Sequence, residues 1–247
     1  MAGLSSVVTR YRRSRAYRIA RVVALLSAVA YVLLLSFPQP LFAHEVTFKN
    51  FTVYAREPLG GGISAVLEKV EARLATSPLY TPDVGPKIFL VNSTRLYASL
   101  SLYLGSNSFG KGFGALPTTN VFINACDLDK DLVFRDAPAY NSRSLSGVIA
   151  HEVTHLLVRN RFGYFRNLTL PVWKKEGYAE YAGGSTLPLD TGVRMWKARP
   201  NDDTGYQYFK YYMIVRYLLE HEKVSVDDLL TRDFDVTALA DAVLKTL

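Results

Sequence analysis

Hydrophobic and polar positions after residue 44 change their period about half-way along the chain. Alternating apolar residues in the first half predict strands, and apolar residues three and four apart predict helices between them. The predicted elements are a strand over His44–Tyr54 with a bulge near Asn50, a helix with Ile63, Val66, Leu67, Val70 and Leu74 on one face, a strand over Ile88–Val91, a helix over Ser93–Leu104 and a strand over Thr119–Ala125.

The second half is mostly helical. The predicted helices are Ser142–Arg159, Pro171–Tyr181, Tyr206–His221, a short helix after Ser225 with Asp228 completing a capping box, and Val236–Thr246 after Asp235. This order predicts an α+β fold, in which a small mixed sheet in the N-terminal half is followed by a helical half. No repeat, charge block or long linker interrupts residues 45–247, so we expect one domain there, preceded by residues 1–44.

Residues 1–44 have the composition of a targeting or anchoring segment. They contain six arginines and no acidic residue, and Val22–Phe37 carries no charge. The arginines are expected to stay cytoplasmic, which places the following domain on the extracytoplasmic side, in the periplasm or outside the cell. An uncleaved signal anchor with a transmembrane helix within residues 19–42 is favoured, because Leu41 suits a cleavage site after Ala43 poorly. The alternative is a cleaved signal peptide and a secreted domain.

The charge and the cysteine content limit the partners and the metal ligands that the chain can have. The chain has 29 Lys and Arg against 22 Asp and Glu, a net charge of +7, but beyond residue 44 the remaining 23 basic and 22 acidic residues leave only +1. A nucleic-acid partner is therefore not expected. Cys126 is the single cysteine, so a metal site must use histidine and carboxylate ligands. We expect Cys126 to be buried and unreactive.

The motif with the clearest chemistry is His151-Glu152-Val-Thr-His155. A chain of this composition would contain H-E-x-x-H by chance about 0.002 times. On a helix, the i, i+4 histidines aim at one point, as two zinc ligands must. Two hydrogen-bonded core histidines are the alternative interpretation. The metzincin pattern is excluded, because Val158 and Arg161 replace its glycine and third histidine.

A catalytic zinc needs a third protein ligand, and Glu176 and Glu180 are the candidates. Their i, i+4 spacing places both carboxylates on one side of the second predicted helix. Glu176 can bind the metal while Glu180 accepts the other ring N–H of a ligand histidine. A solvated acidic face balanced by Lys174 and Lys175 is an equally good interpretation of this segment alone.

Together the two motifs resemble the gluzincin metallopeptidases, the thermolysin-like zincins, and in particular their small bacterial members. The matching segments are H-E-x-x-H at residues 151–155 and W-x-x-E-G-x-A-E-Y at residues 173–181. The resemblance implies a zincin-like fold, with His151, His155 and Glu176 as Zn²⁺ ligands and Glu152 as general base. It also implies that Glu180 supports a ligand from outside the metal's first coordination sphere.

Two further features are placed by this resemblance. A tyrosine of the next helix, which falls on Tyr208, would donate a hydrogen bond to the developing oxyanion, although core packing is the more common role of aromatic residues at helical spacing. The strand over Thr119–Ala125 would form the edge of the cleft, where an extended peptide can add as another strand, and an ordinary sheet strand is at least as good an interpretation. Independently of the resemblance, glycines 110, 112 and 114 lack the Lys-Ser/Thr ending of a phosphate loop and are interpreted as a flexible rim.

The function expected from the sequence is a zinc-dependent hydrolase that cleaves peptide or protein substrates outside the cytoplasmic membrane. Two alternatives stay open. One is a membrane-tethered binding or scaffold protein with an inactive zincin fold, against which the intact Glu152 argues. The other is a zinc hydrolase of a non-peptide substrate.

Overall fold

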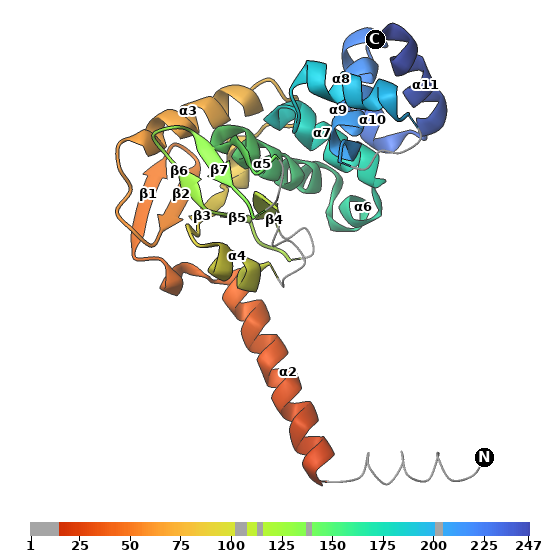
Figure 1. Ribbon diagram of the computed structural model, residues 1–247. Coiled ribbons are helices and arrows are strands. Elements are labelled where there is room, and N and C mark those ends of the chain that lie inside the picture. Colours follow the sequence, from red (N-terminus) through yellow and green to blue (C-terminus); the bar gives the residue numbers. More distant parts are fainter. Residues whose placement is uncertain (1–14, 102–107, 113–115, 137–139, 201–204) are drawn as a thin grey trace, which may run out of the picture. The chain divides into compact units, whose positions relative to one another are not determined.

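The computed structural model describes residues 15–101, 108–112, 116–136, 140–200 and 205–247 (Figure 1). The chain divides into two compact units, residues 1–41 and residues 42–247.

The first unit contains helix α2 (Arg15–Ser36) and a short 3-10 turn (Gln39–Leu41). A 22-residue helix is roughly 33 Å long, which matches the hydrocarbon thickness of a bilayer. Its side chains from Ile19 to Leu33 are largely exposed and apolar, and it is the one described helix long and apolar enough to cross a membrane. A signal sequence near an N-terminus has the same properties, so the helix by itself leaves the topology open.

The second unit begins with a mixed five-stranded sheet in the order β1-β2-β3-β5-β4. Its strands are β1 (His44–Phe48), β2 (Phe51–Ala55), β3 (Lys87–Leu90), β4 (Gly110–Gly112) and β5 (Asn120–Ile123). The three central strands, β2, β3 and β5, run parallel, and the two edge strands pair antiparallel to their neighbours. A smaller antiparallel sheet follows, formed by β6 (Cys126–Asp127), β7 (Leu132–Phe134) and β8 (Ser142–Ser144).

One strand prediction is wrong, and one is confirmed in part. The expected single strand over His44–Tyr54 is a hairpin, because Lys49 adopts a φ of 51° and reverses the chain at Lys49–Asn50. The strand predicted over Thr119–Ala125 is present as β5, but it is an ordinary inner strand between β3 and β4 and not an edge. Gly110 and Gly112, predicted to belong to a flexible rim, form the edge strand β4, while Gly114 lies outside the described residues.

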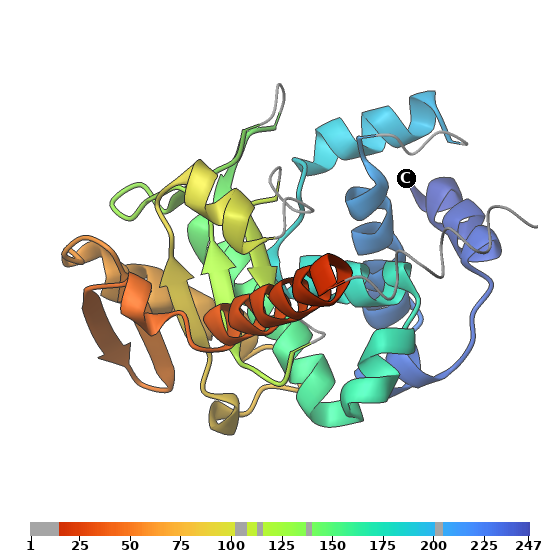
Figure 2. The same ribbon diagram turned by 90° about the horizontal axis from the view of Figure 1, so that it is seen from below.

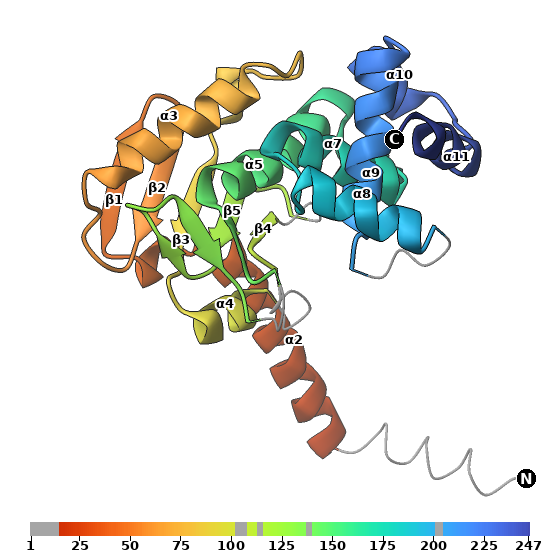
Figure 3. The ribbon, with the colours of Figure 1, turned by 45° about the horizontal axis from the view of Figure 1, so that its top comes forward.

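Helices cover both faces of the large sheet. Helix α3 (Gly62–Leu74) buries all five residues of its predicted stripe and packs against the long helix α5 (Leu145–Phe162). Helix α4 (Thr94–Leu100) lies on the opposite face (Figures 1 and 3). It ends earlier than predicted, and residues 102–107 of the predicted helix lie outside the described part of the chain.

The helical half packs on the side of α5 away from the sheet (Figures 2 and 3). Its helices are α6 (Tyr164–Thr169), α7 (Val172–Gly183), α8 (Leu189–Ala198), α9 (Gln207–Arg216), a π-helical turn at Tyr217–His221 that continues α9, α10 (Val226–Thr231) and α11 (Val236–Thr246). The mixed α+β class and the order of sheet before helices are thus confirmed. The helix predicted from Ser142 begins three residues later, because residues 142–144 form β8.

Candidate metal centre

Helix α5 carries the H-E-x-x-H motif, and polar groups fix where this helix begins. The Ser144 hydroxyl accepts a hydrogen bond from the Gly147 N–H at 3.2 Å. The Asp131 carboxylate accepts one from the Ser146 N–H at 2.7 Å. These contacts satisfy N–H groups of the first turn, which have no partner within the helix. The register of the motif on α5 is therefore set by its N-terminal cap.

Helix α7 carries Glu176 and Glu180 and crosses α5 at very short range. A Cβ atom on Gly147 would lie 2.5 Å from the carbonyl oxygen of Gly183, and one on Gly183 would lie 2.9 Å from His151 Cβ. Both distances are shorter than side-chain contacts allow. Glycine at these two positions is what lets the α7 carboxylates reach the α5 histidines.

Three ligand atoms come together at this crossing. His151 Nε2 lies 3.2 Å from His155 Nε2 and 3.4 Å from Glu176 Oε2, and His155 Nε2 lies 3.5 Å from the same oxygen. These atoms form a nearly equilateral triangle. The side chains are 9%, 16% and 16% exposed for His151, His155 and Glu176. The triangle is thus shielded from bulk water but not sealed off.

The triangle has the size that a metal ion requires. Ligand atoms about 2.0–2.1 Å from a tetrahedral zinc would lie about 3.3 Å apart, close to the three observed separations. Two imidazole nitrogens facing each other at 3.2 Å repel unless a proton or a cation lies between them. The group of His151, His155 and Glu176 can therefore hold a metal ion, and its donor set of two nitrogens and one oxygen suits zinc.

Charge concentrates on the same atoms. Burial by itself would lower the pKa of His151, but the neighbouring carboxylates of Glu176 and Glu180 raise it to about 10. Burial would raise the pKa of Glu176, and the two histidines lower it well below its usual range. The carboxylate therefore stays ionised and draws positive charge to the triangle. A proton and a metal ion compete for this position.

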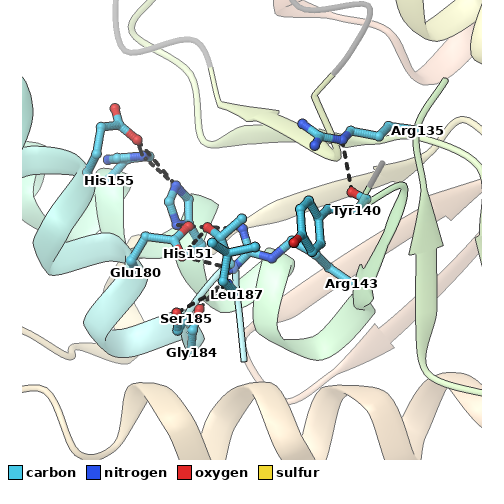
Figure 4. A network of polar contacts seen from close by, with 12 residues as sticks. Arg135, Tyr140, Arg143, His151, His155, Glu180, Gly184, Ser185 and Leu187 are labelled. Carbon is cyan, nitrogen blue, oxygen red and sulfur yellow. Dashed lines mark hydrogen bonds and ion pairs between the residues drawn. The ribbon is translucent and has the colours of Figure 1, made fainter. Parts of the chain in front are cut away.

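Glu180 lies behind His151 and is completely buried. Its Oε1 atom lies 3.1 Å from His151 Nδ1, although the direction of that contact is poor for a hydrogen bond. Arg143 of β8 forms a two-pronged ion pair with Glu180 at 2.9 and 3.2 Å (Figure 4). Thr186 donates to Glu180 Oε2 at 2.6 Å. Burial raises the pKa of Glu180, but Arg143, His151 and Thr186 lower it to about 2.

Glu152 is held by the sheet. Its Oε2 atom accepts a hydrogen bond from the backbone N–H of Gly112 in edge strand β4 at 2.8 Å. The Glu152 side chain is nearly buried, and its negative charge raises the pKa of the neighbouring His151. The carboxylate therefore lies beside the ligand triangle without belonging to it.

Tyr208 of α9 is partly accessible, with 42% of the residue exposed. Burial of its hydroxyl raises the pKa of Tyr208 to about 12, and the charges of Glu176, Glu180 and Glu152 contribute. The phenol therefore stays protonated and can act as a donor near neutral pH.

The structure brings His151, His155, Glu176 and Glu180 together, with Glu152 next to His151 on the same helix, and it removes one alternative. Glu176 and Glu180 do not form a solvated acidic face, because Glu180 is fully buried and Lys174 also turns inward, donating to the Arg232 carbonyl. Arg143 was not predicted to belong to the site, because it has no distinctive spacing from either motif. The Gly112 N–H was not predicted either, although the alternating glycines of β4 were a signal for it in the sequence.

No protein-family model matches the chain, and no curated protein matches it at a significant level. The resemblance to gluzincins therefore rests on the two sequence motifs alone.

Proposed function

We propose that this chain is a zinc-dependent peptidase with a gluzincin-type site and a zincin-like fold. The observation that carries the proposal is the triangle of His151, His155 and Glu176 ligand atoms, 3.2–3.5 Å apart, with the Glu152 carboxylate beside it. Three protein ligands and one free position define a catalytic rather than a structural zinc site.

The placement of Glu152 favours an enzyme over an inactive scaffold. A scaffold needs the metal ligands at most, whereas this site also holds an ionisable base that ligates nothing. That base is fixed by an edge strand, to which an extended peptide can add by backbone pairing. This combination favours peptide bonds as the substrate.

Each residue then has a role in hydrolysis. Zinc, when bound, polarises the scissile carbonyl and lowers the pKa of water. Glu152 takes a proton from the attacking water and later delivers it to the leaving amine. Tyr208 donates a hydrogen bond to the developing oxyanion, for which its raised pKa of about 12 keeps the proton available. Glu180 holds His151 in orientation.

The proposed place of action is the extracytoplasmic side of a membrane. Helix α2 would anchor the chain, and the arginines before it would stay in the cytoplasm. Peptides or proteins outside the cytoplasmic membrane would then be the substrates.

The proposal is tested by the zinc content of the full chain, purified in detergent and dialysed exhaustively. We expect one equivalent of zinc in the wild type and a strong reduction in Glu176→Ala, which loses one of three ligands. Glu220→Ala is the matched control. Glu220 is an exposed carboxylate on the π-helical turn that continues α9, where it pairs with Arg216 away from the α5 and α7 ligands. Its zinc content should equal that of the wild type.

Two results would reject the proposal. A folded wild type without zinc, even after zinc is supplied, would show that the site is not a zinc centre. Equal zinc in wild type and Glu176→Ala would place the metal elsewhere. If zinc is bound as expected, digestion of a mixed peptide library, followed by mass spectrometry, distinguishes a peptidase from a hydrolase of other substrates.

A further inference from the structure

The buried ion pair between Arg143 and Glu180 lies directly behind the candidate metal site. The two side chains are 12% and 1% exposed. Arg143 meets both carboxylate oxygens of Glu180, with Nη1 donating to Oε1 at 2.9 Å and Nη2 donating to Oε2 at 3.2 Å. A planar guanidinium that meets a carboxylate at two points fixes its orientation, which a single contact cannot do.

Both oxygens of Glu180 have a second contact. Thr186 donates to Oε2 at 2.6 Å, so this oxygen is turned away from the metal site. The other oxygen, Oε1, lies 3.1 Å from His151 Nδ1. Rotation of the carboxylate would break all these contacts together. The oxygen presented to His151 is therefore determined by Arg143 and Thr186.

Arg143 is itself immobilised from two sides. Its Nη2 atom donates to the Gly184 carbonyl at 2.8 Å, at the end of α7 (Figure 4). Its guanidinium carbon lies 5.8 Å from the ring centre of Phe109, the residue before edge strand β4. Arg143 thus links the sheet side of the site to the helix that supplies Glu176 and Glu180. It also directly precedes Ser144, which caps α5.

From these contacts we infer that Arg143 is a positioning residue for the metal site, acting on His151 through Glu180. The inference rests on the proposed function, because it assumes that His151 binds zinc through Nε2. The orientation of a ligand histidine depends on the partner of its other ring nitrogen, and that partner is useful only when it is itself fixed. Arg143 provides this fixation from a strand that contributes no ligand.

The test measures zinc affinity of the full chain in detergent by competition with a chromophoric chelator. We expect Arg143→Gln to weaken zinc binding by about 10- to 100-fold, the range found when partners of metal ligands are removed. Arg143→Lys keeps the charge but loses the two-pronged geometry, so its affinity should fall between those of wild type and Arg143→Gln. Arg73→Gln is the matched control. Its guanidinium donates to the Gly183 carbonyl at the same turn, and its loss should leave affinity unchanged.

A double-mutant cycle separates positioning from general loss of structure. If Arg143 acts through Glu180, the double variant Arg143→Gln with Glu180→Gln should bind zinc no more weakly than Glu180→Gln alone. The double variant also leaves no unpaired buried charge, so it stays informative if Arg143→Gln fails to fold. Circular dichroism checks folding, and the visible spectrum of the Co²⁺ form should change in Arg143→Lys but not in Arg73→Gln.

Failure of this inference differs from failure of the proposed function. The positioning role would be overturned if the wild type binds zinc and the folded Arg143 variants bind it with unchanged affinity. Strictly additive effects in the double-mutant cycle would overturn it as well. Both results would leave the zinc site intact. A wild type that binds no zinc would overturn both.

Discussion

Glu152 differs from the other carboxylates of the site because a backbone N–H fixes it. Glu176 faces two histidines, and Glu180 faces an arginine, whereas the partner of Glu152 is the N–H of Gly112 at 2.8 Å. The Gly112 N–H is a neutral partner, so it restricts the position of the Glu152 carboxylate without placing a full positive charge beside it. This is the environment that a general base needs.

Replacing Glu152 by glutamine tests this role. The amide oxygen of Glu152→Gln can still accept the hydrogen bond from Gly112, so the site should keep its shape and its zinc. The amide cannot take a proton at neutral pH, and hydrolysis should fall by about 10²- to 10⁴-fold. Zinc analysis and digestion of a mixed peptide library check both expectations. A variant that retains zinc and cleaves like the wild type would exclude Glu152 as the base.

Cys126 illustrates how its surroundings alter reactivity at a single residue. The prediction that it is buried is wrong, because the residue is only partly buried. Desolvation, together with the charge of Asp127, nevertheless raises the pKa of the Cys126 thiol to about 12. The thiol therefore stays largely protonated at pH 8, and only the thiolate reacts. We expect the folded chain to react very slowly with a chromogenic disulfide at pH 8, and the unfolded chain to react within minutes. Rapid labelling of one thiol in the folded chain would contradict this expectation.

The sequence could predict the ligand residues because helical spacing is local information. Residues four apart share a helix face wherever the helix lies, so His151 and His155 were identifiable as a pair. The contact of Glu176 with these two histidines depends on how α5 and α7 cross. The sequence indicated this contact only through the resemblance to gluzincins. Arg143 could not be identified, because its contact with Glu180 spans 37 residues and follows from tertiary packing alone.

At the scale of elements, helices were predicted better than strands. A strand often pairs with a partner that lies far away in the sequence, so its own residues do not determine its position in a sheet. Thr119–Ala125 has strand character, but only the pairing of β4 with β5 moves it from the edge to the interior. The β4 segment Gly-Lys-Gly carries no strand propensity, and Lys49 occupies a backbone region that lysine seldom adopts.

The glycines of β4 have a physical reason at this scale. A Cβ atom on Gly110 would lie 3.0 Å from both Glu152 Cγ and Val148 Cγ1, whereas one on Gly112 would lie 3.4 Å from Glu152 Oε2. The first contact is tighter than normal packing, and the second is an ordinary contact. The edge strand passes so close to the proposed base that a side chain at position 110 must displace either β4 or Glu152.

This difference gives a matched pair of variants. Gly110→Ala should shift Glu152 or β4 and lower peptide hydrolysis by roughly 10- to 100-fold, because misplacement of about 1 Å has that effect on positioned groups. Gly112→Ala should stay within about threefold of the wild type, since its Cβ is accommodated. Both should keep one equivalent of zinc. Equal activities in the two variants would show that the close approach at Gly110 has no role in placing Glu152.

For the whole molecule, the distribution of charge along the chain is more informative than the net charge. Six arginines give residues 1–44 a charge of +6, while the rest of the chain, at +1, is close to neutral. The second unit, residues 42–247, contains the complete candidate site, and its ligands come from the helices α5 and α7 alone. Membrane association and metal binding are therefore expected to be separable properties of the two units.

The separation of the two units and the orientation of the chain in a membrane can be tested together. Expressed in a bacterial host, the full chain should remain in the membrane pellet after alkaline carbonate washing, because α2 is long and apolar enough to span the bilayer. Protease added to intact spheroplasts should digest residues 42–247, because the arginines before α2 favour the cytoplasmic side for the N-terminus. A cytoplasmic protein of the host, digested only after lysis, is the control for intact membranes.

Removal of residues 1–41 should move the chain to the soluble fraction with its zinc retained. Protection of residues 42–247 until lysis would reverse the proposed topology, and a mature N-terminus at His44 would replace the anchor with a cleaved signal peptide.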